Sequence, residues 1–403
     1  MKKSILLIIL FFCCLLLISI YFVGEKAQEE LHQQIAQLDN PELHVELLSY
    51  KKSFFTAQAD INMTISAEGN PPLRLTVHSD ILHYPYKAQV TSIFSLLDKN
   101  VEEKINHYFQ TTQWLTSQME MNVLGNLSGE FILAKGGVAN EHETISTAPM
   151  YLTYHYDLEK HAGSLAVDWD GLNGQIKNEK FAAEGFSFNT NFTNLIGSTL
   201  FNYQYELQLN QFDFFRSLQH LSLKKIVLQG KSTVSQDNLT VDTESDWKID
   251  EIHNGQQVFH QNQVILLLSK LNIDALYRFK ASLNAQGFSP SALSQLMSLG
   301  AHIDLQKLHS ETPWGEVNGK LLMDIQKGLN ASDIQKNPLS LIDYTNGHLN
   351  LNLPQGLVQQ PTLSSFIQMG VNSGVLQPQG EQLSLETSLD RGELTINGKV
   401  IPM

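Results

Sequence analysis

The chain has 403 residues, of which 42% are hydrophobic, 17% charged and 9% aromatic. This balance is ordinary for a globular protein and excludes general disorder, a collagen-like repeat and a multi-span transporter, each of which needs a strongly biased composition. The formal net charge of −14 makes nucleic acid an unfavourable partner, because an acidic surface repels a phosphate backbone.

The N-terminus has the clearest local pattern, since residues 4–23 contain no charged side chain. As an α-helix this segment spans about 30 Å, the thickness of a bilayer's hydrocarbon core. Two lysines precede it and three glutamates follow, so the positive-inside rule leaves a cytoplasmic tip at residues 1–3 and sends the rest outward. We predict a single transmembrane anchor with the lipid bilayer as its partner. A cleavable signal peptide is the alternative, although its apolar region is usually shorter.

Both cysteines of the chain, Cys13 and Cys14, lie inside this apolar segment. The remaining residues therefore carry no thiol. Disulfides, thiolate zinc sites, iron–sulfur clusters and cysteine nucleophiles are excluded there.

Residues 24–40 have the pattern of a helical stalk. Leu31, Ile35 and Leu38 share one helical face, and Asn40-Pro41 ends the helix. Two interpretations stay open. The stalk packs on its own domain, or the three apolar side chains form a short dimer contact.

From residue 41 to the C-terminus the dominant hydrophobic period is two, which is typical of half-buried strands. Ile61, Met63 and Ile65 alternate with polar residues, for example. The same alternation recurs at Leu152–Leu158, Leu165–Trp169, Tyr203–Leu209, Leu349–Leu353 and Leu383–Leu385. The sequence predicts a mainly β fold of extended antiparallel sheets with a few short helices, following the N-terminal transmembrane helix.

Turn-forming pairs separate these runs, and they favour hairpin connections. The pairs are Asn70-Pro71, Asp170-Gly171, Asn173-Gly174, Asn254-Gly255, Asn318-Gly319, Asn346-Gly347 and Asn397-Gly398. Residues 136–148 form the most loop-like stretch, and we expect any division of the region 41–403 there.

Four segments have helical signals. Ser289-Pro290 opens one helix with a capping serine and a proline at the first position, and Gly300 ends it. Residues 98–110 are a second helix by apolar spacing. Residues 337–344 and 361–371 are weaker candidates.

Metal-binding patterns are incomplete. Local histidine pairs such as His155 with His161 match neither the spacing of one strand face nor that of one helix face. Asp168, Asp170 and Glu179 fall on three positions of a calcium loop, but Leu172 supplies no ligand oxygen. We therefore predict no metal site and no cofactor.

Nucleophile patterns are also weak. Ser49-x-x-Lys52 and Ser222-x-x-Lys225 match a serine–lysine spacing that arises often by chance, and the chain lacks a G-x-S-x-G elbow. No residue is predicted to be catalytic.

The apolar strand faces suggest a different property. An antiparallel sheet must cover such a face with another sheet, a helix, a partner or an apolar ligand, and the expected helices are few. An ordinary core and an open groove for acyl chains are the two alternatives, of which a closed core is the more frequent outcome.

Several segments together resemble the YdgA-like family of bacterial envelope proteins. They are the N-terminal anchor with its polar helix, SYKKSFFTAQADINMTI at 49–65, TPWGEVNGKLLMDI at 312–325 and LTINGKVIPM at 394–403. The resemblance implies an inner-membrane protein of Gram-negative bacteria with a large periplasmic part. It implies no reaction and no catalytic residue.

We predict a non-enzymatic, single-pass inner-membrane protein whose C-terminal region lies in the periplasm and acts as an envelope scaffold or maintenance factor. A homodimer, a lipid or an envelope protein is the expected partner. The first alternative is a carrier or groove for lipid acyl chains, and the second is a periplasmic hydrolase.

Overall fold

A computed structural model provides the fold. It describes residues 19–29, 31–32, 35, 43–66, 71–196, 199–217, 219–286, 289–328, 330–361 and 363–401. Strands dominate it, and every pairing with a described register is antiparallel, so the mainly β prediction is confirmed. The chain separates into two units, residues 1–191 and 192–403, and strand β11 (Glu179–Ile196) contains the boundary.

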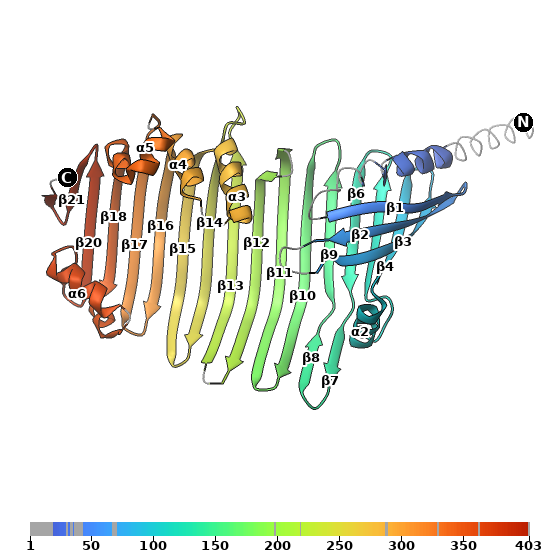
Figure 1. Cartoon of the computed structure of the whole chain (residues 1–403), viewed down its shortest axis with the longest axis horizontal. Helices are drawn as coiled ribbons and strands as arrows, with labels where there is room; N and C mark the ends of the chain where they lie inside the picture. The colour runs from blue at the N-terminus through green and yellow to red at the C-terminus, as the bar shows by residue number, and fades with distance from the viewer. Residues whose placement is uncertain are drawn as a thin grey trace, which may run out of the picture. The chain divides into compact units, whose positions relative to one another are not determined.

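The first unit is a meander of neighbouring strands (Figure 1). Strands β1 to β6 pair in chain order, then β6 pairs with β9 and β9 with β10. A hairpin of β7 and β8 adds to the far end of β10. The strands are β1 (Leu43–Lys52), β2 (Thr56–Ile65), β3 (Leu73–His83), β4 (Lys87–Leu96), β5 (Leu115–Asn122), β6 (Asn126–Leu133), β7 (Gly136–Ala139), β8 (Glu143–Thr147), β9 (Met150–Asp157) and β10 (Ala162–Ile176).

Two helices accompany these strands. The N-terminal helix, described at residues 19–29, 31–32 and 35, packs Val23 against Ala57, Ala59 and Ile81 of the sheet. Helix α2 (Lys99–Phe109) begins at Asp98, whose side chain accepts hydrogen bonds from two backbone amides of the first turn. The predicted helix at 98–110 is therefore confirmed.

The second unit continues with longer strands. Strands β12 to β18 pair in chain order, β18 pairs with β20, and β19, β21 and β22 complete that edge. They are β12 (Thr199–Arg216), β13 (Gln219–Val234), β14 (Thr240–Asn254), β15 (Gln257–Asn272), β16 (Ala301–Thr312), β17 (Gly315–Ile325), β18 (Thr345–Pro354), β19 (Gln377–Gln379), β20 (Gln382–Asp390), β21 (Glu393–Ile396) and β22 (Lys399–Ile401).

Short helices cover two ends of this second sheet. They are α3 (Ile273–Gln286), α4 (Pro290–Ser298), α5 (Ala331–Lys336) and the 3-10 helix η1 (Pro338–Tyr344) at one end, and the 3-10 helix η2 (Gln355–Gln359) with α6 (Ser364–Asn372) at the other (Figure 1). The first group forms a core with Val241, Leu271 and Ile325. The second forms a separate core around Leu357, Ile367 and Leu383. Ser289 caps α4 as predicted, and both weaker helical candidates are short helices.

Four predictions of turns are wrong. Gly171 and Gly174 lie within β10, Gly319 lies within β17 and Gly347 lies within β18, so none of these strands ends there. Gly171 has a φ of 132°, and a Cβ there would meet the backbone oxygen of Ala183 at 2.0 Å. The glycine therefore allows a close approach of neighbouring backbones rather than a reversal of the chain. Asn254-Gly255 and Asn397-Gly398 are turns as predicted.

The loop predicted at residues 136–148 is also wrong, because it contains the β7–β8 hairpin. Its composition is small and polar, but β8 gains its ladder from β10, for example through Ile145 opposite Gly174. Long-range pairing thus overrides the weak local strand signal.

Among the described residues, no helix is both long and apolar enough to cross a membrane. Residues 4–18 of the predicted anchor lie outside that part of the chain, as do residues 36–40 of the predicted stalk. The anchor remains a prediction.

Candidate functional site

One face of the second unit carries a continuous row of apolar residues across eight strands. Directly opposed residues of an antiparallel pair project from the same face, so the strand registers alone define such a row. The row is Leu207, Leu228, Trp247, Val264, Leu308, Gly319, Leu351 and Leu385, from β12 to β18 and then β20.

A second row lies beside it on the same face. It is Tyr205, Gly230, Ser245, Leu266, Leu305, Leu321, Leu349 and Thr387, again directly opposed strand by strand. A Cβ at Gly230 would meet the Tyr205 ring at 2.3 Å, so the tyrosine lies across the glycine. We call the two rows together the apolar strip.

The apolar strip is only half covered. Apart from its two glycines none of its residues is buried, and Trp247 is 46% exposed. Large aliphatic side chains in a closed core are usually buried almost completely. Within the described residues of the second unit, the strip is therefore a sheet face and not the interior of a core.

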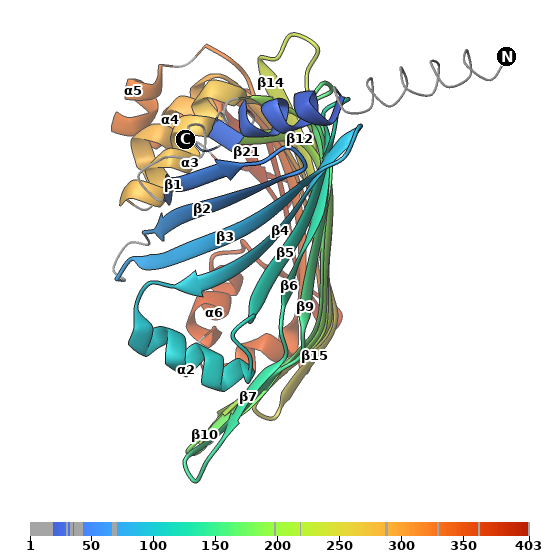
Figure 2. The ribbon, with the colours of Figure 1, turned by 90° about the vertical axis from the view of Figure 1, so that its right-hand side faces the viewer.

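The two helical cores border the strip along β17. Alternate residues of this strand lie on one face, from Met323 in the first core through Leu321 and Gly319 in the strip to Val317 in the second. The helices are accordingly on the strip's face and beyond its edges. Figures 1 and 2 show α3 and α4 at one end of the strands and α6 at the other.

The opposite face of the same strands is mostly polar, although it also carries Ile265, Leu267 and Leu322. Residues next to the strip in sequence include Gln229, Lys248, Lys307 and Lys320. Asp246 accepts a hydrogen bond from Lys248 at 2.7 Å and one from Gln263 at 2.8 Å. This difference between faces is the pattern of a sheet that is hydrated on one side and requires a cover on the other.

The dimensions of the strip suit an extended chain better than a globular ligand. Neighbouring strands lie about 4.8 Å apart, so eight strands give a length of about 34 Å, whereas two rows cover about 7 Å along the strands. One lipid tail spans half of a hydrocarbon core, or about 15 Å.

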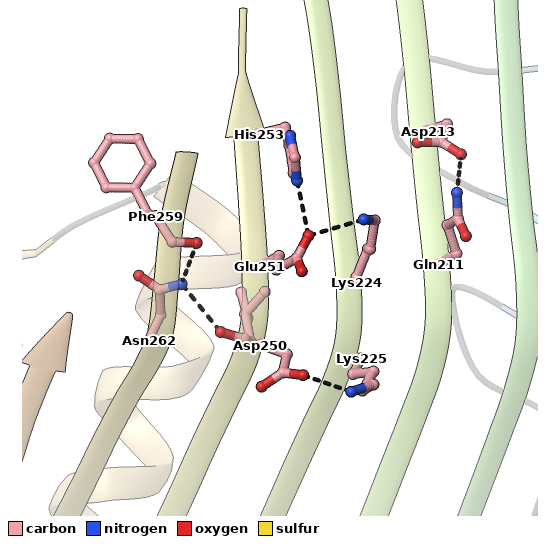
Figure 3. A network of polar contacts seen from close by, with 10 residues as sticks. Gln211, Asp213, Lys224, Lys225, Asp250, Glu251, His253, Phe259 and Asn262 are labelled. Carbon is pink, nitrogen blue, oxygen red and sulfur yellow. Dashed lines mark hydrogen bonds and ion pairs between the residues drawn. The ribbon is translucent and has the colours of Figure 1, made fainter. Parts of the chain in front are cut away.

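A polar network lies further along β13 and β14, beyond one edge of the strip (Figure 3). Lys224 Nζ and His253 Nε2 each lie 2.8 Å from Glu251 Oε2. These two hydrogen bonds lower the pKa of Glu251 to about 2. A carboxylate that stays ionised at neutral pH is poorly matched to proton transfer, so the network favours a structural role.

The residues weighed as nucleophiles or ligands are not brought together. Ser49 Oγ donates to Asp60 at 2.7 Å, while Lys52 pairs with Glu25 of the N-terminal helix. Ser222 is buried opposite His253. Across the described part of the chain, no group of three or more histidine, cysteine, aspartate or glutamate side chains could hold a metal ion.

The three residues of the predicted dimer contact have different environments. Leu31 packs against the core of its own unit, beside Val23 and Ala57. Ile35 is half-buried, and Leu38 lies outside the described residues. Dimerisation through this helix stays a prediction.

Sequence alternation identified several members of the strip, among them Leu349, Leu351 and Leu385, but not their register across strands. Trp247 and Leu308 were missed as members. The spacing Trp247-x-Ile249 continues the period of two and could have found Trp247. Leu308 had no such signal, because the ladder shifts between Leu305 and Leu308 and alternation from Leu305 leads to Lys307.

Fold and site thus define a mainly β protein with a half-exposed apolar sheet face. The chain belongs to a bacterial family described as "Bacterial protein of unknown function (DUF945)", whose model matches residues 1–403. Comparison with curated proteins and with solved structures gave no match.

Proposed function

We propose that this protein binds lipid acyl chains along the apolar strip, while residues 4–23 anchor it in the bacterial inner membrane and the remainder lies in the periplasm. The uncharged N-terminal run and the two lysines before it support the anchor and its orientation. Of the functions considered from the sequence, an acyl-chain carrier is the one that gives the apolar strip of the second unit a direct role.

The observation that carries this proposal is the unbroken row from Leu207 to Leu385, which is apolar at every position and partly exposed except at Gly319. Each methylene group removed from water contributes about 0.8 kcal/mol, so a long flat apolar row favours an aliphatic chain in proportion to the length it covers. Among the residues that the structure describes, no comparable arrangement supports a hydrolase, and a scaffold role explains the strip only if another protein covers it.

Photo-crosslinking in cells tests the proposal on the intact chain. Benzoylphenylalanine replaces Leu228 or Leu351 in the strip, and the matched controls place it at Gln229 or Asn350, the adjacent positions on the opposite face. After irradiation, mass spectrometry should find lipid adducts on the strip variants and far fewer on the controls.

Protein adducts at Leu228 and Leu351 without lipid adducts would favour a scaffold covered by a partner. Equal lipid labelling of strip and control positions would mean that the labelling is unspecific. Either result contradicts acyl-chain binding on the strip.

A further inference from the structure

Three turns of the first unit expose large apolar side chains at one end of its sheet. The β1–β2 turn carries Phe54 and Phe55, the β3–β4 turn carries Tyr84 and Tyr86, and the β5–β6 turn carries Val123 and Leu124. We call these six residues the tip patch. Their exposed fractions are 44% and 53%, 37% and 61%, and 47% and 74% in that order.

The three turns are close neighbours. Strands β1 to β6 are antiparallel and pair in chain order, so these three connections lie at the same end of the sheet. The backbone amide of His83 donates to the Phe55 oxygen at 2.8 Å, and that of Val123 donates to the Tyr86 oxygen at 3.0 Å. The six side chains therefore form one surface.

The N-terminal helix lies along this same end (Figure 2). Glu25 forms an ion pair with Lys52 beside the first turn, and Lys26 Nζ donates to the backbone oxygen of Val123 at 3.4 Å. Gly24 packs against His83, next to the second turn. The helix is thus fixed to the strand ends that carry the tip patch.

The first described residues of the helix add to the exposed apolar surface. Tyr21 is 48% exposed and Phe22 is 65% exposed, whereas Val23 faces the sheet. They directly follow residues 4–18, which contain no charge. In the sequence, this uncharged run leads directly into the helix beside the tip patch. A run of that kind favours a lipid bilayer as the cover of the patch.

We propose that the tip patch is a membrane-docking surface that seats this end of the first unit in the interfacial region of the bilayer. Tyrosine and phenylalanine side chains are suited to that depth, because their rings are apolar and a tyrosine hydroxyl reaches the headgroups. Lys51 is exposed at the end of β1, where its amine can reach lipid phosphates, whereas Lys52 and Lys87 are paired with Glu25 and Glu120. The proposal shares the membrane anchor with the proposed function and does not depend on the apolar strip.

Electron paramagnetic resonance on the full chain in phosphatidylethanolamine–phosphatidylglycerol vesicles tests this surface. Cys13 and Cys14 are replaced by alanine, and a nitroxide is attached at Leu124→Cys or, in a second variant, at Tyr86→Cys. The control is Ile176→Cys, which is 39% exposed and lies at the far end of β10. The ratio of collision rates with oxygen and with a water-soluble nickel complex reports whether each label is in lipid.

We expect a severalfold higher oxygen-to-nickel ratio at Leu124 and Tyr86 than at Ile176. A ratio at both tip positions equal to that at Ile176 overturns the proposal. So does spin–spin broadening at the tips that disappears on dilution with unlabelled protein, because a second copy would then cover the patch. Lipid crosslinks on the strip are measured separately, so failure of one proposal leaves the other distinguishable.

Discussion

Glu251 is a residue whose ionisation the fold alters strongly. Its pKa falls from the ordinary 4.5 to about 2 because Lys224 and His253 both contact the carboxylate. A group whose pKa is lower in the folded state contributes stability that is present above its unfolded pKa and is lost as the pH falls toward the folded value. The pH window for this contribution therefore runs from about 4.5 down to about 2.

Glu251→Gln should accordingly lower the free energy of unfolding at pH 7, and the difference from the wild type should shrink as the pH falls below 4.5. Urea unfolding at several pH values measures it. Glu244→Gln, an exposed change on the same strand, controls for the lost charge. A difference that stays constant down to pH 3 would contradict the assigned pKa.

Two leucines on neighbouring strands allow the stability contribution of a core residue to be compared with that of a strip residue. Leu383 is 3% exposed and belongs to the core of η2 and α6, so Leu383→Ala should cost about 2–5 kcal/mol of unfolding free energy. Leu351 is half-buried in the strip, and Leu351→Ala should cost only about 1 kcal/mol. Equal losses in urea unfolding would show that Leu351 lies in a closed core.

At the scale of elements, the N-terminal helix depends on a small residue at its contact with the sheet. A Cβ at Gly24 would lie 2.9 Å from the His83 ring, which is only 4% exposed and cannot easily move aside. Overpacking of this kind costs about 1–3 kcal/mol.

Gly24→Leu should therefore destabilise the first unit and release the helix, seen as faster hydrogen exchange at residues 19–29. Glu29→Leu adds the same side chain at an exposed position of this helix and should have little effect on exchange. Unchanged exchange in Gly24→Leu would mean that the sheet accommodates the larger residue.

Alternation predicted strands such as β2, β9, β10, β12, β18 and β20, because a half-buried face imposes a period of two whatever lies beyond it. Alternation could not predict where, within one strand, the apolar positions change from odd to even residue numbers. In β12 the apolar positions are odd up to Leu209 and even from Phe212, and the β12–β13 ladder omits Asn210 and its neighbour Lys225. Lys225 has a φ of 51°, a local irregularity without a glycine to indicate it.

Helix α3 was missed for a related reason. It directly follows β15, and its apolar residues Ile273, Leu276 and Phe279 continue an already apolar segment. Periodicity in short apolar runs does not separate strand from helix. The apolar strip could therefore be predicted only in part from the sequence. Several of its residues follow a visible alternation, but their alignment across eight strands depends on how the strands pair.

For the whole molecule, the apolar strip contrasts with the high net negative charge. A chain with 41 acidic residues and 27 basic ones keeps its polar face well hydrated, yet it leaves a mainly aliphatic row partly exposed over eight strands. Exposed patches of this size on soluble surfaces usually mark a binding site. Because the cores lie beyond the edges of the strip except at Leu385, which packs against the second core, changes elsewhere in the strip should affect a ligand more than the fold.

The double variant Leu228→Gln with Leu351→Gln tests that separation. Glutamine keeps the size of leucine but adds an amide that an acyl chain cannot pair, which costs about 1–3 kcal/mol per buried group. Native mass spectrometry of the full chain should show less bound phospholipid or fatty acid than in the wild type. The melting temperature should change little.

The control variant, Gln229→Ala with Asn350→Ala, alters the opposite face of the same two strands and should retain the lipid. If the glutamine variant keeps its lipid, the strip is not the binding surface. If it instead unfolds while the control stays folded, these leucines are part of a closed core, which favours the scaffold function.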